Sequence, residues 1–204
     1  MAPGNNFGVT TDDQPFSQME ASLKKAAAAL REAGIPFLLG GSLASWARGG
    51  PETTHDLDFM IKPDDAERAL EVLAEEGMKP ERPPEEWLLK VWDGDVLIDL
   101  VHHPAGIEMS DEVIERGDKL NVLSVEMDVM SLEDVLTTKL RALTEHDLDY
   151  SRLLEIARAL REQIDWELVR ERTDESPFAK AFFVLVEDLG IAPAAGEAGL
   201  ENAN

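Results

Sequence analysis

Cysteine is absent from this chain of 204 residues, which excludes disulfides, thiolate metal sites and a cysteine nucleophile. Long apolar runs are absent as well, and no segment approaches the roughly 20 residues that cross a bilayer. Residues 1–15 hold no basic stretch followed by an apolar one, so they do not resemble a secretory leader. We therefore expect a cytoplasmic protein.

Positive charge is scarce. Lys and Arg together number 19 against 42 Asp and Glu, which gives a formal net charge of −23. Such a charge repels phosphate backbones at long range and argues against a broad duplex nucleic-acid face. Two interpretations of the acidity stay open: a solvated surface that aids solubility, and attraction of a cationic small substrate.

The length suits one core with a small helical appendage. We expect a flexible arm at 1–13, a core at 14–130, a helical subdomain at 131–190 and a flexible tail at 191–204. The order of the elements predicts an α/β (α+β) fold, in which a mixed sheet carries flanking helices and is followed by the helical subdomain.

Apolar periodicity and turn residues predict the individual elements. Ser17 and Glu20 form a capping box for a helix that ends at Gly34, and Asp93-Gly94 is typical of a tight hairpin turn. The predicted strands are Ile35–Gly41, Asp56–Lys62, Trp87–Trp92, Val96–His103 and Asn121–Met130. The further predicted helices are Ser42–Arg48, Asp64–Glu76, Ser131–Glu145, Tyr150–Gln163, Trp166–Arg172 and Pro177–Leu189.

A glycine pair follows the first of these strands, in the sequence Gly40-Gly41-Ser42. Glycines at the end of a strand let the backbone approach a ligand, and exposed amides there can bind phosphate oxygens. The Ser42 hydroxyl is suited to capping the next helix or to contacting a phosphate. The alternative is a turn that uses glycine for its geometry alone.

Two aspartates, Asp56 and Asp58, alternate with large apolar residues in the next strand, so pleating places both carboxylates on one face. Mg²⁺ or Mn²⁺ would relieve their repulsion, and solvent exposure is the alternative. Asp99 lies within the apolar run 96–101, where an ionised carboxylate is costly without a cation or donors. It suits a third metal ligand or a general base, and an Asp bonded to a loop or an Arg is the alternative.

Together these residues resemble the nucleotidyltransferase superfamily that includes DNA polymerase beta and the antibiotic nucleotidyltransferases. The resemblance covers residues 37–101, about a third of the chain. It implies an NTP substrate and a Mg²⁺ or Mn²⁺ cofactor. It also implies that the metal ligands are Asp56, Asp58 and Asp99. The implied phosphate contacts are Gly40, Gly41 and Ser42.

A second resemblance lies in the carboxyl-terminal half. The stretch from Ser131 to Leu143, followed by Asp147-Leu-Asp149, is similar to stand-alone nucleotidyltransferases grouped with the AbiEii-type toxins. In that group a helix lysine and a downstream aspartate accompany the core motif. Lys139 falls near the centre of the apolar stripe of its helix, so it either snorkels to the edge or enters the cleft to hold a triphosphate. Capping is the better interpretation of Asp147 or Asp149.

The four histidines and four tryptophans add less. His55, His102 and His103 flank the carboxylate strands, but consecutive histidines on a strand point oppositely, which favours solvation over a zinc site. The scattered tryptophans suit core or rim packing better than base stacking.

The resulting hypothesis is a metal-dependent nucleotidyltransferase that transfers a nucleoside monophosphate from an NTP to an acceptor hydroxyl and releases pyrophosphate. The toxin-like resemblance suggests an RNA end such as tRNA as acceptor, and a cognate antitoxin as a partner. The negative charge instead suits an aminoglycoside-like cation. The rival hypotheses are a non-catalytic nucleotide-binding module and a protein that binds a divalent ion for structure alone.

Overall fold

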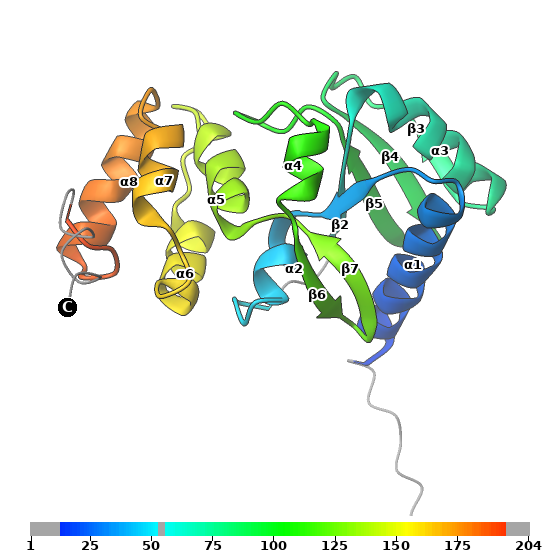
Figure 1. The fold of residues 1–204 in the computed structure, drawn as a ribbon, viewed down its shortest axis with the longest axis horizontal. Helices are drawn as coiled ribbons and strands as arrows, with labels where there is room; N and C mark the ends of the chain where they lie inside the picture. The colour runs from blue at the N-terminus through cyan, green and yellow to red at the C-terminus, as the bar shows by residue number, and fades with distance from the viewer. Residues whose placement is uncertain (1–12, 53–55, 195–204) are drawn as a thin grey trace, which may run out of the picture.

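The computed structural model describes residues 13–52 and 56–194 (Figure 1). Residues 1–12 of the expected arm, most of the expected tail and His55 lie outside this range. The helices are α1 (Asp13–Glu32), α2 (Gly41–Trp46), the 3-10 turn η1 (Pro63–Asp65), α3 (Ala66–Glu75), α4 (Asp111–Glu115), α5 (Leu132–Arg141), α6 (Ser151–Leu160), α7 (Trp166–Arg172) and α8 (Pro177–Asp188). The strands are β1 (Phe37–Leu39), β2 (Asp56–Ile61), β3 (Lys79–Glu81), β4 (Leu88–Asp93), β5 (Val96–Val101), β6 (Asp118–Val122) and β7 (Val125–Val129).

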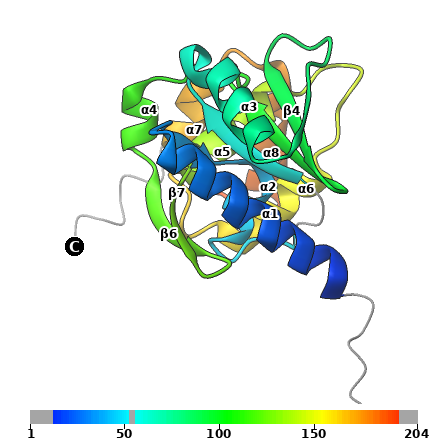
Figure 2. The same cartoon turned by 90° about the vertical axis from the view of Figure 1, so that its right-hand side faces the viewer.

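The strands form one mixed sheet in the order β3-β4-β5-β2-β1-β7-β6. β2 runs parallel to β5 and β1 parallel to β7, and the other neighbours are antiparallel. Helices α1 and α3 pack on one face (Figure 2), whereas α2 contacts β2 and α5. This arrangement confirms the predicted fold class. Among the described residues, no helix is both long and apolar enough to cross a membrane.

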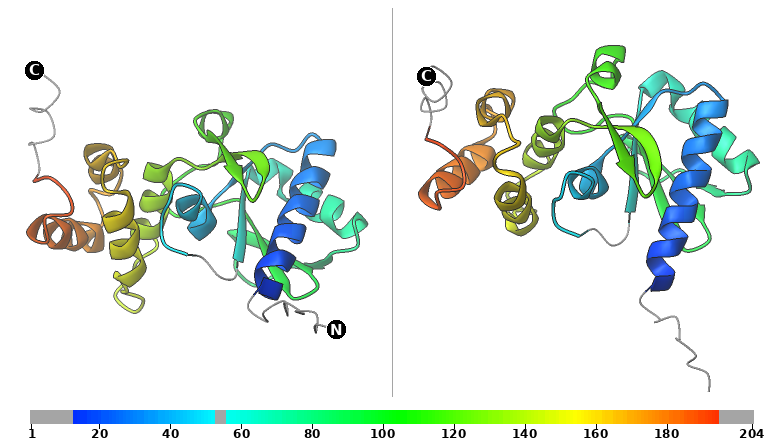
Figure 3. Two further views of the ribbon diagram at one scale, coloured as in Figure 1. Left: turned by 90° about the horizontal axis from the view of Figure 1, so that it is seen from below. Right: turned by 60° about the horizontal axis from the view of Figure 1, so that its bottom comes forward.

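Burial explains why β2 and β5 lie in the middle of the sheet. Leu57, Phe59 and Ile61 of β2 are fully buried, as are Ile98 and Leu100 of β5. Their apolar side chains belong to one core cluster, which spans the sheet and helices α1 to α3. A second apolar cluster joins α5, α6, α7 and α8. Figure 3 shows these four helices, yellow-green to orange-red, at the end of the molecule opposite the blue α1.

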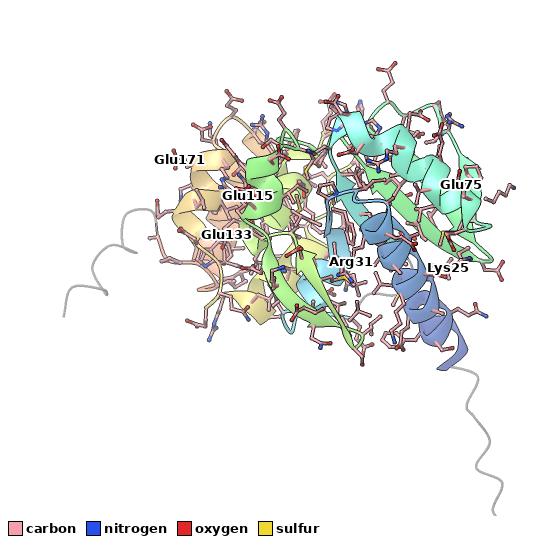
Figure 4. The ribbon with its side chains drawn as sticks, turned by 45° about the vertical axis from the view of Figure 1, so that its right-hand side comes forward. Lys25, Arg31, Glu75, Glu115, Glu133 and Glu171 are labelled. Atoms are coloured by element: carbon pink, nitrogen blue, oxygen red, sulfur yellow. The ribbon has the colours of Figure 1, made fainter. Side chains whose placement is uncertain are left out.

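Acidic side chains are distributed over the surface. Figure 4 labels Glu75 on α3, Glu115 on α4 and Glu171 on α7, three exposed carboxylates on separate helices. This distribution fits the interpretation of the net charge as a solvated surface.

Two local predictions are wrong, and two elements were missed. α1 begins at Asp13, so Ser17 lies within the helix and does not cap it. Residues 121–130 do not form one strand, because Leu123 and Ser124 have positive φ angles of 50° and 65° and turn the chain into the β6–β7 hairpin. The strand β3 and the helix α4 were not predicted. By contrast, the antiparallel hairpin of β4 and β5 around Asp93-Gly94 is confirmed.

A buried ion-pair cluster ties the sheet to the carboxyl-terminal helices. Asp134 of α5 is fully buried and accepts hydrogen bonds from Arg116 Nε and Nη2 at 2.7 and 2.9 Å. Arg172 of α7 donates to the same carboxylate at 2.6 Å. Ser131 caps α5 by accepting from the Asp134 backbone N–H at 3.2 Å. Asp134 therefore fixes α5 between α4 and α7.

We expect Asp134→Asn to lower the free energy of unfolding by about 2 kcal/mol, because two arginines lose their ionic partner. Chemical denaturation measures this. The matched control is Asp128→Asn in the exposed Lys119–Asp128 pair, which we expect to change stability by about 0.5 kcal/mol or less. Equal effects of the two substitutions would contradict the role of the cluster.

Candidate functional site

The glycine turn lies directly against one of the predicted aspartates. Gly40 follows β1, and its N–H donates to the carbonyl oxygen of Asp58 at 2.8 Å. Gly41 has a φ angle of +57°, and a Cβ on it would lie 1.7 Å from Asp58 Oδ2. Only glycine therefore allows the Asp58 carboxylate to approach the start of α2. Gly40 takes the cap position of this helix, and Ser42 lies within its first turn.

The second feature is a row of charges across the sheet. Asp58 of β2 is the register partner of Asp99 on the parallel strand β5, and Lys90 of β4 is the partner of Asp99 on its other side. The distance from Lys90 Nζ to Asp99 Oδ1 is 3.4 Å. Asp56 is exposed and lies two residues before Asp58 on the same strand face. The sheet thus brings Asp58, Asp99 and Lys90 together, with Asp56 toward the solvent end.

The proton affinities in this row are unusual. Burial, with repulsion from Asp99 and Asp56, raises the pKa of Asp58 to about 6, although Lys139 and Lys90 act in the opposite direction. Burial also raises the pKa of Asp99, against the opposing effect of Lys90. Two carboxylates are therefore held together without enough positive charge to offset their burial.

Lys139 faces these carboxylates from α5. A cleft of about 590 Å³ has Gly41, Asp58 and Lys139 in its lining. The other lining residues are Met60, Trp87, Val101, His103, Pro104, Ala105, Thr138, Ala142 and Asp147. Burial lowers the pKa of Lys139, and Asp58 counteracts this, while Arg152 adds to it. The sequence left open whether Lys139 extends to the edge of its helix or enters the cleft, and in the structure it lines the cleft.

The donor set fits a divalent cation by its chemistry. Carboxylate oxygens are the ligands that Mg²⁺ and Mn²⁺ prefer, and the mutual repulsion that raises the pKa of Asp58 is what a cation relieves. Within residues 13–52 and 56–194, however, no three His, Asp or Glu side chains are grouped closely enough to hold a metal. The three predicted aspartates therefore do not form a complete ligand cage by themselves.

Among the described residues no histidine belongs to a group of three potential metal ligands, and His55 lies outside those residues. His102 and His103 follow β5, which ends at Val101, and their Nδ1 atoms lie 2.6 Å apart. The expectation that they point oppositely is wrong, because neither belongs to the strand. Burial and the neighbouring His103 lower the pKa of His102.

The two downstream aspartates have different positions. Asp149 Oδ1 accepts a hydrogen bond from the backbone N–H of Ser151 at 2.8 Å, and hydrogen bonds with Ser151 lower the pKa of Asp149. The cap position of α6 is Tyr150, and its side chain makes no capping bond. Asp147 instead lines the cleft from the α5–α6 loop. Trp87 also lines the cleft and is 47% exposed. The sequence interpretation assigned neither Asp147 nor Trp87 to the cleft. The available signal for Asp147 was the downstream aspartate that accompanies the helix lysine in the second resemblance.

A family model described as "Uncharacterised nucleotidyltransferase" matches residues 16–187. No curated protein matches the sequence.

Three solved structures resemble the chain at low identity. The solution structure of the antibiotic-resistance factor ANT(2'')-Ia has a TM-score of 0.60 at 16% identity and covers 85% of this chain and 98% of its own. The crystal structure of ANT(2'')-Ia with adenylyl-2''-tobramycin has a TM-score of 0.59 at 15% identity, with coverages of 80% and 98%. JHP933 from Helicobacter pylori has a TM-score of 0.51 at 15% identity, with coverages of 90% and 81%. At these identities the similarity establishes a shared fold.

We expect Gly41→Ala to lower the free energy of unfolding by roughly 2–4 kcal/mol, because the new Cβ combines left-handed strain with a clash against Asp58. Gly34→Ala is the matched control. Its φ is +65° with nothing within 4 Å of the added Cβ, so about 1 kcal/mol of strain remains. Adding Asp58→Ala to Gly41→Ala should recover part of the loss. No recovery in this double-mutant cycle would contradict the contact.

Asp58 also predicts a pH dependence of stability. Its pKa rises from 3.8 to about 6 on folding, so the folded chain holds the proton more tightly than the unfolded chain. The free energy of unfolding should therefore fall as the pH rises through this window, after correction for the remaining groups. Chemical denaturation of the wild type and Asp58→Asn across the window measures the difference, which should vanish if Asp58 titrates normally.

Proposed function

Because the chain belongs to the uncharacterised nucleotidyltransferase family, we propose that it transfers a nucleoside monophosphate from an NTP to an acceptor hydroxyl. The observation that carries the proposal is the cleft, in which Gly41, Asp58 and Lys139 line one cavity and Asp99 lies beside Asp58. In this proposal residues 14–130 supply one wall and residues 131–190 the other.

The triphosphate binds at the Gly41 end of the cleft. Gly41 presents its backbone close to the carboxylate of Asp58 because it has no Cβ, and Gly40 and Ser42 lie on either side of it at the start of α2. Lys139 supplies the positive charge, since its ammonium group lines the same cavity. Its lowered pKa has burial as the first cause, and phosphate oxygens would favour its charged form.

Asp58, with Asp56 and Asp99, would hold a Mg²⁺ or Mn²⁺ ion, and ligand oxygens would complete the coordination. Such an ion, when bound, neutralises phosphate charge and polarises the phosphoryl group. The raised pKa of Asp58 supports this assignment, because a bound cation would offset both the burial of this carboxylate and its repulsion from Asp99 and Asp56.

In the transfer step, the acceptor oxygen forms a bond to the alpha phosphorus, and the bond from that phosphorus to the bridging oxygen of pyrophosphate breaks. Asp99 takes the proton of the attacking hydroxyl, which its raised pKa favours. Lys90 is the cross-strand neighbour that orients the Asp99 carboxylate, at 3.4 Å. Lys139 offsets the charge that develops on the leaving pyrophosphate.

The acceptor is better described as a small molecule than as RNA. The toxin-like resemblance suggested an RNA end and a cognate antitoxin, but a net charge of −23 opposes a polyanion at long range. A cavity of about 590 Å³ is also in the range of small-molecule sites. The adenylyl-2''-tobramycin complex of ANT(2'')-Ia is consistent with this choice.

A thermal-shift series with Mg²⁺ alone, each NTP alone and both together tests the proposal. Mg²⁺ and the preferred NTP together should raise the melting temperature by more than the sum of their separate shifts. Asp58→Asn should abolish the excess. The control Asp118→Asn, in an exposed ion pair with Arg48, should retain it.

Label transfer from the alpha-labelled NTP to a pool of small hydroxyl compounds and to an RNA pool then identifies the acceptor class. If the ion alone produces the whole shift, the protein binds a structural ion. If the ion and NTP bind together but no label moves to either pool, the chain is a nucleotide-binding module without turnover.

A further inference from the structure

The cleft has a second end that the phosphate site does not use. Its lining there is largely apolar and comprises Trp87, Val101, His103, Pro104 and Ala105. Trp87 is the most notable of these, because its indole is 47% exposed, whereas Trp166 is buried and Trp92 is only partly exposed. A large aromatic surface in a cavity is a place where the face of a ring packs.

The backbone holds Trp87 firmly in this position. The Trp87 carbonyl oxygen accepts hydrogen bonds from the backbone N–H groups of His102 and His103, at 3.0 and 3.1 Å. These bonds continue the pairing of β4 with β5 by one step beyond the partners Leu88 and Val101. Trp87 is therefore attached to the sheet and does not lie on a free loop.

The position of Trp87 along the sheet indicates which substrate it contacts. From β1 through β2 and β5 to β4, the site groups follow one another as Gly41, Asp58, Asp99 and Trp87. At about 4.8 Å between neighbouring strands, the strand of Trp87 lies about 10 Å from that of Asp58. The nucleotide phosphates belong at the Gly41 end, and Asp99 receives the proton of the acceptor. A ring beyond Asp99, at Trp87, therefore belongs to the acceptor.

The residues that the helical part contributes to the cleft indicate the charge of the acceptor that carries this ring. Asp147 lines the same cleft from the α5–α6 loop, and its side chain is exposed. Lys139 also belongs to the helical part, and the proposed function assigns it to the phosphate end of the cleft. An aromatic ring and a carboxylate that line one cleft favour a protonated amine, because the indole and the carboxylate both attract it. The net charge of −23 attracts the same cation at long range.

We propose that Trp87 and Asp147 form the acceptor subsite, and that they bind a ring-bearing amine whose ring packs on the indole and whose ammonium group lies near Asp147. The inference rests on the proposed function and narrows its acceptor from any hydroxyl compound to a cyclic amino alcohol. It also assigns Trp87 to substrate binding, not to rim packing alone.

Tryptophan fluorescence tests the subsite without requiring turnover. The probes are tobramycin and glucosamine as ring amines, glucose as the neutral analogue of glucosamine, and a short single-stranded RNA. We expect both amines to change the fluorescence of the magnesium–NTP complex, and glucose and RNA to leave it unchanged. Trp87→Phe should remove the signal, and the matched control Trp92→Phe, on the same strand, should retain it.

Calorimetric measurement of tobramycin affinity separates the contribution of Trp87 from that of Asp147. Trp87→Ala should weaken tobramycin binding by about fivefold or more, and Trp87→Phe should restore part of it. Asp147→Asn should weaken it by about threefold. Asp149→Asn, whose carboxylate accepts the backbone N–H of Ser151, should leave it unchanged.

Three outcomes would overturn the inference: neither amine binds, RNA competes for the Trp87 signal, or the magnesium–NTP pair alone changes the fluorescence of Trp87. Its failure is distinct from that of the proposed function. If magnesium and NTP still stabilise the protein together while neither amine binds, only the acceptor subsite is wrong. If they do not stabilise it together, the nucleotidyltransferase proposal fails first.

Discussion

The site depends on the register between two parallel strands. Asp58 of β2 lies opposite Asp99 of β5. The buried apolar residues that flank the two aspartates on these strands maintain this register. Phe59 and Leu100 are register partners and are fully buried, as are Leu57 and Ile98. A slip of one residue would turn the carboxylates into the core and the apolar side chains out of it. The burial that stabilises the sheet therefore also holds the two carboxylates side by side, at the cost of the repulsion that raises the pKa of Asp58.

The other wall of the cleft depends on a second buried contact. α5 carries both Asp134, a fully buried carboxylate that pairs with the partly exposed Arg116 and Arg172, and Lys139, which lines the cleft. The two residues are five positions apart on one short helix, so fixing the first restricts the second. Lys139 consequently faces Asp58 from a helix whose position is fixed by the ion pairs of Asp134.

The sequence predicted those parts whose signal is local. The alternation of Leu57, Phe59 and Ile61 with the aspartates is visible in the chain, and so is the Asp93-Gly94 turn between β4 and β5. Parts with no local signal were missed. Lys79, Pro80 and Glu81 are all exposed in β3, and nothing about Leu123 or Ser124 announces the positive φ angles that separate β6 from β7. Trp87 and Asp147 become neighbours in one cleft only because a loop of the helical part lies over the end of β5, a placement that no window of sequence contains.

Charge explains how so acidic a chain can bind a nucleotide. Across the sheet the register places Glu81 beside Lys90, Lys90 beside Asp99 and Asp99 beside Asp58, so charges of both signs alternate until two carboxylates meet. Lys139 faces this pair from the opposite wall. A triphosphate arriving alone would meet one lysine and two or three carboxylates, which is unfavourable; arriving with a divalent cation, it brings the missing positive charge. The same excess of carboxylates continues past Asp99 to Asp147, where no phosphate is expected and a cationic acceptor would supply the balance. Under the proposed function, the surface charge would repel a bare polyanion, and the cleft would select substrates that carry positive charge with them.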